Sequence, residues 1–238
     1  MCESNHIWPA ETPAWLTAGE TQRLAGLSGG ARDDFLASRW LIRRALAEAS
    51  GSGAFDCRPV PGRPDRSEQP PGWRLSLSHS AGLAGCAVSG DAPIGLDLEP
   101  IARNPQWQKV VSRWFSPPET AWLLAANDSE AFLKVWTLKE AWLKATGRGI
   151  ANNLKTLTIT ADFELSGDRP GEPWRACLGK STKHWVAVVY QSRFVPRGFT
   201  IPGQIDPINP GMAAADARPV DWILQKEIHS CSEPHGLR

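Results

Sequence analysis

The chain has 238 residues, 42% of them apolar and 21% charged, and its 26 basic and 25 acidic side chains leave a formal net charge of +1 at pH 7. This length is sufficient for one large or two small domains with a substantial core. A charge so close to zero argues against a nucleic-acid-binding protein, which needs a basic excess to neutralise backbone phosphates. Any recognition of anions is therefore expected to be local.

The sequence predicts a cytoplasmic protein that does not interact with membranes. No run of about 18 apolar residues occurs, and residues 1–6 lack the basic-then-apolar order of a signal peptide. The five cysteines are odd in number, widely spread and without a C-x-x-C pair. We interpret them as reduced thiols with no metal role.

Residues 1–92 are expected to form an N-terminal half of mixed helix and antiparallel sheet. The patterns predict a helix over 31–49 and strands near 54–60, 73–79 and 83–89. Arg39 lies in the amphipathic part of this helix. A ligand-binding role and a simple position on the solvated face of the helix explain this residue equally well. The polar, Pro-rich segment Asp65–Gly72 is interpreted as a linker.

The strand at 73–79 runs into a polar cluster, Ser78-His79-Ser80. Strand ends at turns are common places for functional sites. A single histidine is more often a satisfied structural residue, and no acidic residue at suggestive spacing marks His79 as part of a nucleophilic triad. The functional reading therefore depends on the motifs that follow.

The segment Ile94-Gly95-Leu96-Asp97-Leu98-Glu99 predicts a strand with two faces. Alternation sends Ile94, Leu96 and Leu98 into the core and places the two carboxylates on the other face. Their spacing is about 6.5 Å, close enough for both to reach one cation. Gly95 is expected to leave room for a ligand. An edge strand with a solvated acidic face is the alternative.

Residues 93–200 are expected to form a second half. Helices are predicted near 117–126 and over 131–145, with Gly147 as a C-terminal stop signal. On the second helix Trp136, Glu140 and Lys144 share one column, flanked by Lys139. The alternative is an ordinary surface pair between Glu140 and Lys144. Strands follow near 155–160, 173–178 and 184–190, and residues 201–238 read as a Pro/Gly-rich, partly disordered tail.

Four motifs together resemble, in order and spacing, the signature of the 4′-phosphopantetheinyl transferases of the larger, Sfp-type branch. The resemblance covers roughly residues 20–190. The motifs are Gly62-Arg63-Pro64, Ser78-His79-Ser80, Gly95 to Glu99 with the pattern G-x-D-x-E, and Trp136 to Lys144 with the pattern W-x-x-K-E-A-x-x-K. One departure is Ser76, where relatives often carry Asn.

This resemblance implies an α+β fold of two similar halves, with antiparallel sheets and packed helices, related by a pseudo-two-fold axis. It also implies an activity: Mg²⁺-dependent transfer of the phosphopantetheine arm of coenzyme A to a serine of apo acyl or peptidyl carrier proteins, with release of adenosine 3′,5′-bisphosphate. Such carriers serve fatty acid, polyketide and nonribosomal peptide biosynthesis. Mn²⁺ is expected to substitute for Mg²⁺ in vitro.

The family pattern assigns Asp97, Glu99 and Glu140 as metal ligands. The contacts to coenzyme A expected from the resemblance are Arg39, Arg63, Ser78, His79, Lys139 and Lys144, of which Lys139, Lys144 and His79 would meet phosphate groups and Arg63 the adenosine end. Glu140 is the candidate general base, with His79 and Lys144 as the other catalytic candidates. If Glu140 only binds metal, Lys144 or bulk water would take the proton.

The protein is expected to be a monomer, and the segment Val110–Ser116 is where the family suggests a carrier-binding surface. Core packing is the alternative for Trp114 and Phe115, and is preferred for Phe115. Two other functions are compatible with these residues. A metal-dependent diphosphate hydrolase would release phosphopantetheine without a carrier, and a non-catalytic carrier-binding module would bind carriers independently of magnesium.

Overall fold

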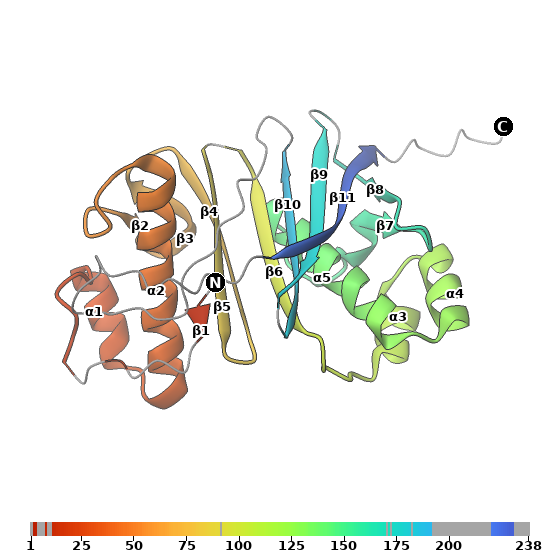
Figure 1. Cartoon of the computed structure of the whole chain (residues 1–238), viewed down its shortest axis with the longest axis horizontal. Coiled ribbons are helices and arrows are strands. Elements are labelled where there is room, and N and C mark those ends of the chain that lie inside the picture. The colour runs from red at the N-terminus through yellow and green to blue at the C-terminus, as the bar shows by residue number, and fades with distance from the viewer. Residues whose placement is uncertain are drawn as a thin grey trace.

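A computed structural model of the chain describes residues 2–3, 8, 11–90, 92–169, 171, 173–181, 183–191 and 220–230. Two β-sheets face each other in the middle of the molecule, and helices cover their outer sides (Figure 1). The predicted α+β class, with largely antiparallel sheets and packed helices, is confirmed. The pseudo-two-fold relation between the halves stays a prediction.

The first half has helix α2 (Gly29–Ser50) packed on the sheet β1-β5-β4-β3-β2. A shorter helix, α1 (Ala18–Ala25), begins at a capping box, in which Thr17 Oγ1 accepts from Glu20 N and the Glu20 carboxylate accepts from Thr17 N. The strands are β1 (Cys2–Glu3), β2 (Arg58–Val60), β3 (Arg63–Gln69), β4 (Trp73–Ser80) and β5 (Leu83–Gly90).

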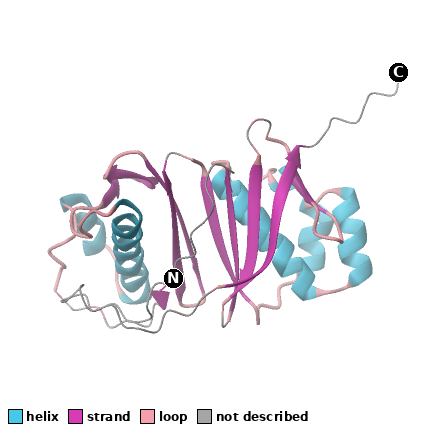
Figure 2. Cartoon of the chain, turned by 45° about the horizontal axis from the view of Figure 1, so that its top comes forward, coloured by secondary structure: helices cyan, strands magenta, loops and turns pink. Residues whose placement is uncertain are grey.

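The second half has the sheet order β6-β10-β9-β11-β8-β7, in which only the β11–β8 pair is parallel among the described residues. Helix α5 (Ser129–Ala145) packs across β6 and β10, on the side away from the first half (Figure 2). The other elements are β6 (Ile94–Pro100), α3 (Trp107–Trp114), α4 (Pro117–Ala126), η1 (Leu154–Thr156), β7 (Leu157–Ile159), β8 (Leu165–Gly167), β9 (Trp174–Lys180), β10 (His184–Gln191) and β11 (Asp221–Ser230).

Two segments differ from their sequence interpretation. The Pro-rich segment expected as a linker, Asp65–Gly72, largely belongs to strand β3, because Ser67 is buried and its Oγ donates to Pro70 O and accepts from Trp73 N. Strand β11 lies within the range assigned to the tail, yet it inserts between β9 and β8. The predicted disorder at 203–218 lies outside the described residues.

Strand β6 joins the two halves through serine side chains. β10 occupies one edge of β6, and at the other edge Ser76 Oγ accepts from Leu96 N at 2.8 Å and Ser78 Oγ from Leu98 N at 3.2 Å. Both serines come from β4. Since unpaired edge amides are costly when buried, these two hydroxyls fix β6 against the first sheet.

No helix among the described residues combines the length and the apolar character that crossing a bilayer requires.

Candidate active site

The alternation predicted for residues 94–99 is present in β6. Leu96 and Leu98 pack between the two sheets, whereas Asp97 and Glu99 contact side chains of α5 on the opposite face. The sequence predicted that Gly95 leaves room for a ligand, and this prediction is wrong. A Cβ atom there would lie 1.9 Å from Ala141 O and 2.5 Å from Ala145 N. The glycine is required because the α5 backbone lies directly against the strand.

Asp97 is held from both halves of the protein. Its Oδ1 accepts from Ser78 Oγ at 3.0 Å and from Lys144 Nζ at 2.7 Å. Its Oδ2 is buried and has no hydrogen-bond partner among the residues that the structure describes. Burial raises the pKa of Asp97, and the nearby Lys144 ammonium opposes that rise. One carboxylate oxygen therefore remains available to a ligand.

Glu99 is buried at 7% exposure and meets two donors through one oxygen. Trp136 Nε1 donates to Glu99 Oε1 at 2.9 Å, and Arg103 Nη1 donates to the same oxygen at 2.5 Å. Trp136 belongs to α5, one turn before Glu140. Arg103 follows β6 in an exposed turn, four residues after Glu99.

Glu140 is the third carboxylate beside this strand. Burial raises its pKa to about 7, and the negative charge of Asp97 adds to the rise while Lys144 opposes it. Such a carboxyl group changes its protonation near neutral pH. Its environment thus differs from that of an exposed Glu–Lys surface pair, which was the alternative from the sequence.

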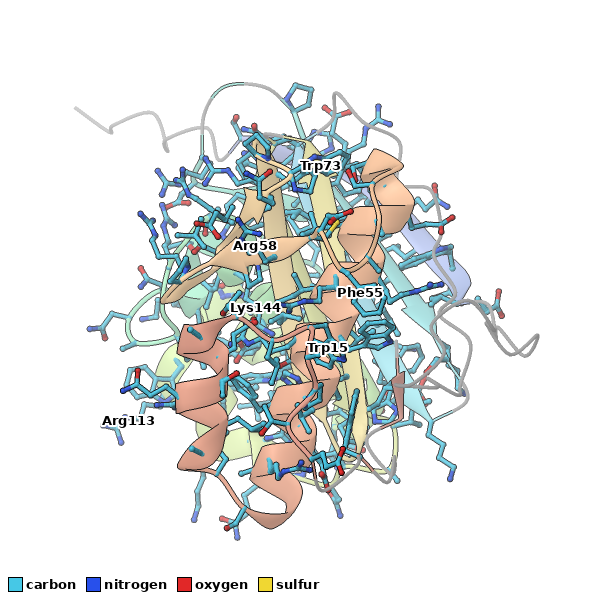
Figure 3. All side chains as sticks on the ribbon, turned by 90° about the vertical axis from the view of Figure 1, so that its left-hand side faces the viewer. Trp15, Phe55, Arg58, Trp73, Arg113 and Lys144 are labelled. Carbon is cyan, nitrogen blue, oxygen red and sulfur yellow. The ribbon has the colours of Figure 1, made fainter. Side chains whose placement is uncertain are left out.

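These groups line a cavity of about 550 Å³ at the junction of the two halves. Seen from the side of α1 and α2, Lys144 lies near the centre of the molecule, whereas Arg113 points outwards at the periphery (Figure 3). The lining residues are Leu77, Ser78, His79, Ser80, Asp97, Leu98, Glu99, Pro100, Arg103, Glu140 and Lys144. The structure thus brings together six of the residues singled out from the sequence: Ser78, His79, Asp97, Glu99, Glu140 and Lys144.

His79 lies at the end of β4, where the strand reaches the cavity. Partial removal from solvent lowers the pKa of His79, and Asp34 acts in the opposite direction. A neutral imidazole at pH 7 can donate one hydrogen bond and accept another. The Arg39 and Lys144 charges also act on this ring, which places both cations in its neighbourhood.

Lys139 was expected to contact phosphate, whereas in this structure its ammonium group is paired inside the protein. Its side chain is 0% exposed and faces away from the cavity. Nζ forms an ion pair with Glu119 Oε1 at 2.7 Å and donates to Leu154 O at 2.7 Å and to Leu157 O. All three ammonium donors are therefore used inside the protein.

The remaining predicted contacts do not line the cavity. Arg39 is mostly buried and lies 3.7 Å from Glu20, and its Nε has no hydrogen-bond partner. Arg63 is 62% exposed on β3, beside Asp65. Ser78 does line the cavity, but its hydroxyl is already used between Asp97 and Leu98 N, so that here it orients the carboxylate.

The donor set suits a hard divalent cation, although a complete ligand shell is not preformed. Among the residues that the structure describes, no three His, Cys, Asp or Glu side chains are close enough to form a ready metal cluster. However, the candidate ligands are oxygens only, and the buried Asp97 Oδ2 lacks a partner. Carboxylate oxygens of this kind are what Mg²⁺ prefers. The oxygen donors of Asp97, Glu99 and Glu140 are thus of the chemical type that such an ion prefers.

Sequence reasoning did not identify Arg103, the contact between Trp136 and Glu99, or the contact of Ser76, which it named only as a departure from the family pattern. The spacing of Arg103 four residues after Glu99 was the only local signal for the first. The others depend on contacts between segments far apart in the chain, such as Ser76 with Leu96 N. Phe115, in contrast, is buried at 3% exposure in the large core of the second half, as its core interpretation predicted.

Residues 93–199 match the model of the 4′-phosphopantetheinyl transferase superfamily. The chain is similar to the 4′-phosphopantetheinyl transferase AcpT of Salmonella typhimurium, with 31% identity over 58% of this chain and 70% of the relative. It is also 36% identical to HetI of Nostoc, a 4′-phosphopantetheinyl transferase, over 50% of this chain and 54% of the relative. The transferase psf-1 of Bacillus pumilus is 40% identical over 38% of this chain and 39% of its own length.

Proposed function

Because the chain belongs to the 4′-phosphopantetheinyl transferase superfamily and is an enzyme of this family, we propose that it transfers the 4′-phosphopantetheine arm of coenzyme A to a serine of apo acyl or peptidyl carrier proteins. The observation that supports this most is the cavity at the junction of the halves, where three carboxylates of the second half meet Ser78 and His79 of the first. The reaction would depend on Mg²⁺ and release adenosine 3′,5′-bisphosphate.

In the proposed step the serine oxygen of the carrier attacks the phosphorus that bears the pantetheine arm. A new P–O bond forms to serine, the diphosphate P–O bond breaks, and adenosine 3′,5′-bisphosphate leaves with the bonding electron pair. The serine proton passes to a base on the protein. Asp97, Glu99 and Glu140 would hold Mg²⁺, and the bound ion would neutralise the negative charge of the diphosphate.

Glu140 is the proposed base. A general base is most effective when its pKa lies near the working pH, and burial beside Asp97 raises the pKa of Glu140 to about 7. Glu140 lines the cavity together with Lys144, so a substrate hydroxyl that enters the cavity would lie beside the Glu140 carboxylate. Lys144 or bulk water is the alternative acceptor, with Glu140 then acting as a ligand only.

Lys144 and His79 are the proposed contacts to the diphosphate, since both line the cavity. The Lys144 side chain is 31% exposed, and its ammonium is positioned by Asp97 and by Leu96 O at 3.0 Å. Arg39 is proposed for coenzyme A because its charge acts on His79 and its Nε, 3.7 Å from Glu20 Oε1, makes no hydrogen bond within the described part of the chain. Arg63 is proposed for the adenosine end, where a guanidinium can bind the 3′-phosphate through two hydrogen bonds.

The carrier would dock on α3, where basic and aromatic side chains are combined. The Arg113 guanidinium lies 4.8 Å from the centre of the half-buried Trp114 ring, and Lys109 is exposed on the same helix. Such a surface complements an acidic carrier helix. We further propose that the protein acts as a monomer in the cytoplasm, in fatty acid, polyketide or nonribosomal peptide biosynthesis.

The test combines the purified protein, coenzyme A, Mg²⁺ and apo carrier proteins of each class, with intact-mass spectrometry of the carriers. We expect one phosphopantetheine arm to be added, with EDTA abolishing the gain. Asp97→Asn and Glu140→Gln should lower the rate strongly, and the exposed Lys155→Met should leave it unchanged. If coenzyme A is cleaved while no carrier gains mass, the protein is instead a metal-dependent hydrolase of diphosphates.

A further inference from the structure

Two basic side chains are paired with the carboxylates of the cavity. Lys144 Nζ lies 2.7 Å from Asp97 Oδ1, and Arg103 Nη1 lies 2.5 Å from Glu99 Oε1. Both cations also act on Glu140. A divalent cation that binds the same carboxylates would meet two positive charges at short range, so its binding competes with at least one of these ion pairs.

The two pairs differ in how firmly they are held. Lys144 comes from the helix α5, and its ammonium also donates to Leu96 O at 3.0 Å. Arg103 comes from the turn after β6 and its side chain is 44% exposed, and Glu99 is the only hydrogen-bond acceptor of its guanidinium among the described residues. A guanidinium with one contact on an exposed turn loses little when it moves into water.

Glu99 itself does not depend on Arg103 for its orientation. Trp136 Nε1 donates to the same oxygen at 2.9 Å from the rigid helix α5. The carboxylate would therefore keep its place after Arg103 leaves. It would then lack a neighbouring positive charge. The bound cation would have to supply this charge, because a carboxylate at 7% exposure is costly to leave uncompensated.

We propose that Arg103 is an exchangeable counter-ion of the metal site: its guanidinium neutralises Glu99 when no divalent cation is bound and moves into solvent when one binds. This inference rests on the proposed function, since it takes Glu99 as a metal ligand. It assigns to Arg103 the role of neutralising the buried Glu99 carboxylate in the metal-free protein, and its positive charge lowers the apparent affinity for the metal.

The experiment counts free Mn²⁺ by electron paramagnetic resonance during titration of the full-length protein at about 0.15 M salt. In Arg103→Gln the positive charge is removed, so we expect Mn²⁺ to bind more tightly, on the order of fivefold. Arg103→Lys keeps a positive charge and should stay within about twofold of the wild type. Mg²⁺ added as a competitor should show the same order of affinities.

Arg58→Gln is the matched control, because Arg58 is 40% exposed and pairs with one carboxylate, Glu68, at 2.6 Å on the edge strand β2. Its charge is screened beyond about 8 Å at this salt concentration, so Mn²⁺ affinity should not change. Equal affinity in Arg103→Gln and the wild type would overturn the role of Arg103 alone. Absence of Mn²⁺ binding in every variant would overturn the metal site as well.

Discussion

Lys139 and Glu119 form an ion pair at 2.7 Å in which the two side chains are 0% and 1% exposed. Glu119 also accepts from Ile159 N at 2.9 Å and from Ser116 Oγ at 2.7 Å. The pair thus connects α5 to α4 and to strand β7. Because Glu140 follows Lys139 directly, this internal connection fixes the part of α5 that faces the cavity.

Replacement of Lys139 by Met should therefore lower stability. The change leaves a buried Glu119 charge without its partner, and breaking a pair of this kind costs about 3–5 kcal/mol of unfolding free energy. Urea unfolding measures the loss, with the exposed Lys155→Met as the control. The double variant Glu119→Leu/Lys139→Met should recover part of the stability. A Lys139→Met protein of wild-type stability with lost activity would instead point to the phosphate contact expected from the sequence.

The metal-free protein should become less stable as the pH rises from about 4.5 to about 7. The pKa of Glu140 is raised from 4.5 in the unfolded chain to about 7 in the folded protein. The folded state therefore binds the proton more tightly within this window, and stability is lost as the proton leaves. The raised pKa of Asp97 acts with the same sign.

Thermal unfolding at pH 5.5 and pH 8 in EDTA checks this dependence. Glu140→Gln should flatten it, because the amide carries no proton that can be lost in this range. Mg²⁺ should stabilise the wild type more at pH 8 than at pH 5.5, since it competes with protons for the same oxygens. The same slope in Glu140→Gln and the wild type would exclude Glu140 as the group responsible.

Ser78→Ala should weaken both stability and metal binding. The change leaves Leu98 N without its acceptor and removes the hydrogen bond to Asp97 Oδ1. Loss of a buried partner costs about 1–3 kcal/mol. Ser76→Ala is the matched control, because Ser76 accepts from Leu96 N and, among the described residues, makes no hydrogen bond to a carboxylate. Only Ser78→Ala should then lower Mn²⁺ affinity, and an equal effect in both variants would mean that Ser78 acts through the backbone alone.

Gly95→Ala should prevent correct packing of α5. The new methyl group would lie 1.9 Å from Ala141 O, which is backbone and cannot move without shifting the helix. We expect a loss of more than about 4 kcal/mol, measured by urea unfolding or seen as insoluble protein. Gly90→Ala, where nothing lies within 4 Å, is the control. A stable Gly95→Ala protein with weakened substrate binding would support the ligand-access role instead.

Local patterns were reliable where one periodicity ran without interruption. The helix expected at 131–145 is Ser129–Ala145, and Gly147 follows with a φ of +68°, as a C-terminal stop signal. The helix expected at 117–126 is Pro117–Ala126. Strand β3 was not predicted because its proline and charged residues are unusual in a strand. They are tolerated here because β3 pairs irregularly with β2, at the edge of the sheet.

The sequence by itself determined the elements and the alternation that separates Asp97 and Glu99 from the leucines of the same strand, because backbone geometry repeats every two residues. The sequence predicted the same role for Lys139 and Lys144, and only the tertiary structure shows that their surroundings differ. Both lysines belong to the same motif on one helix, but they point in different directions. Lys139 is surrounded by Glu119 and the β7 region, whereas Lys144 lines the open cavity beside β6. The free energy of a charge depends on its surroundings, and those come from segments remote in the chain.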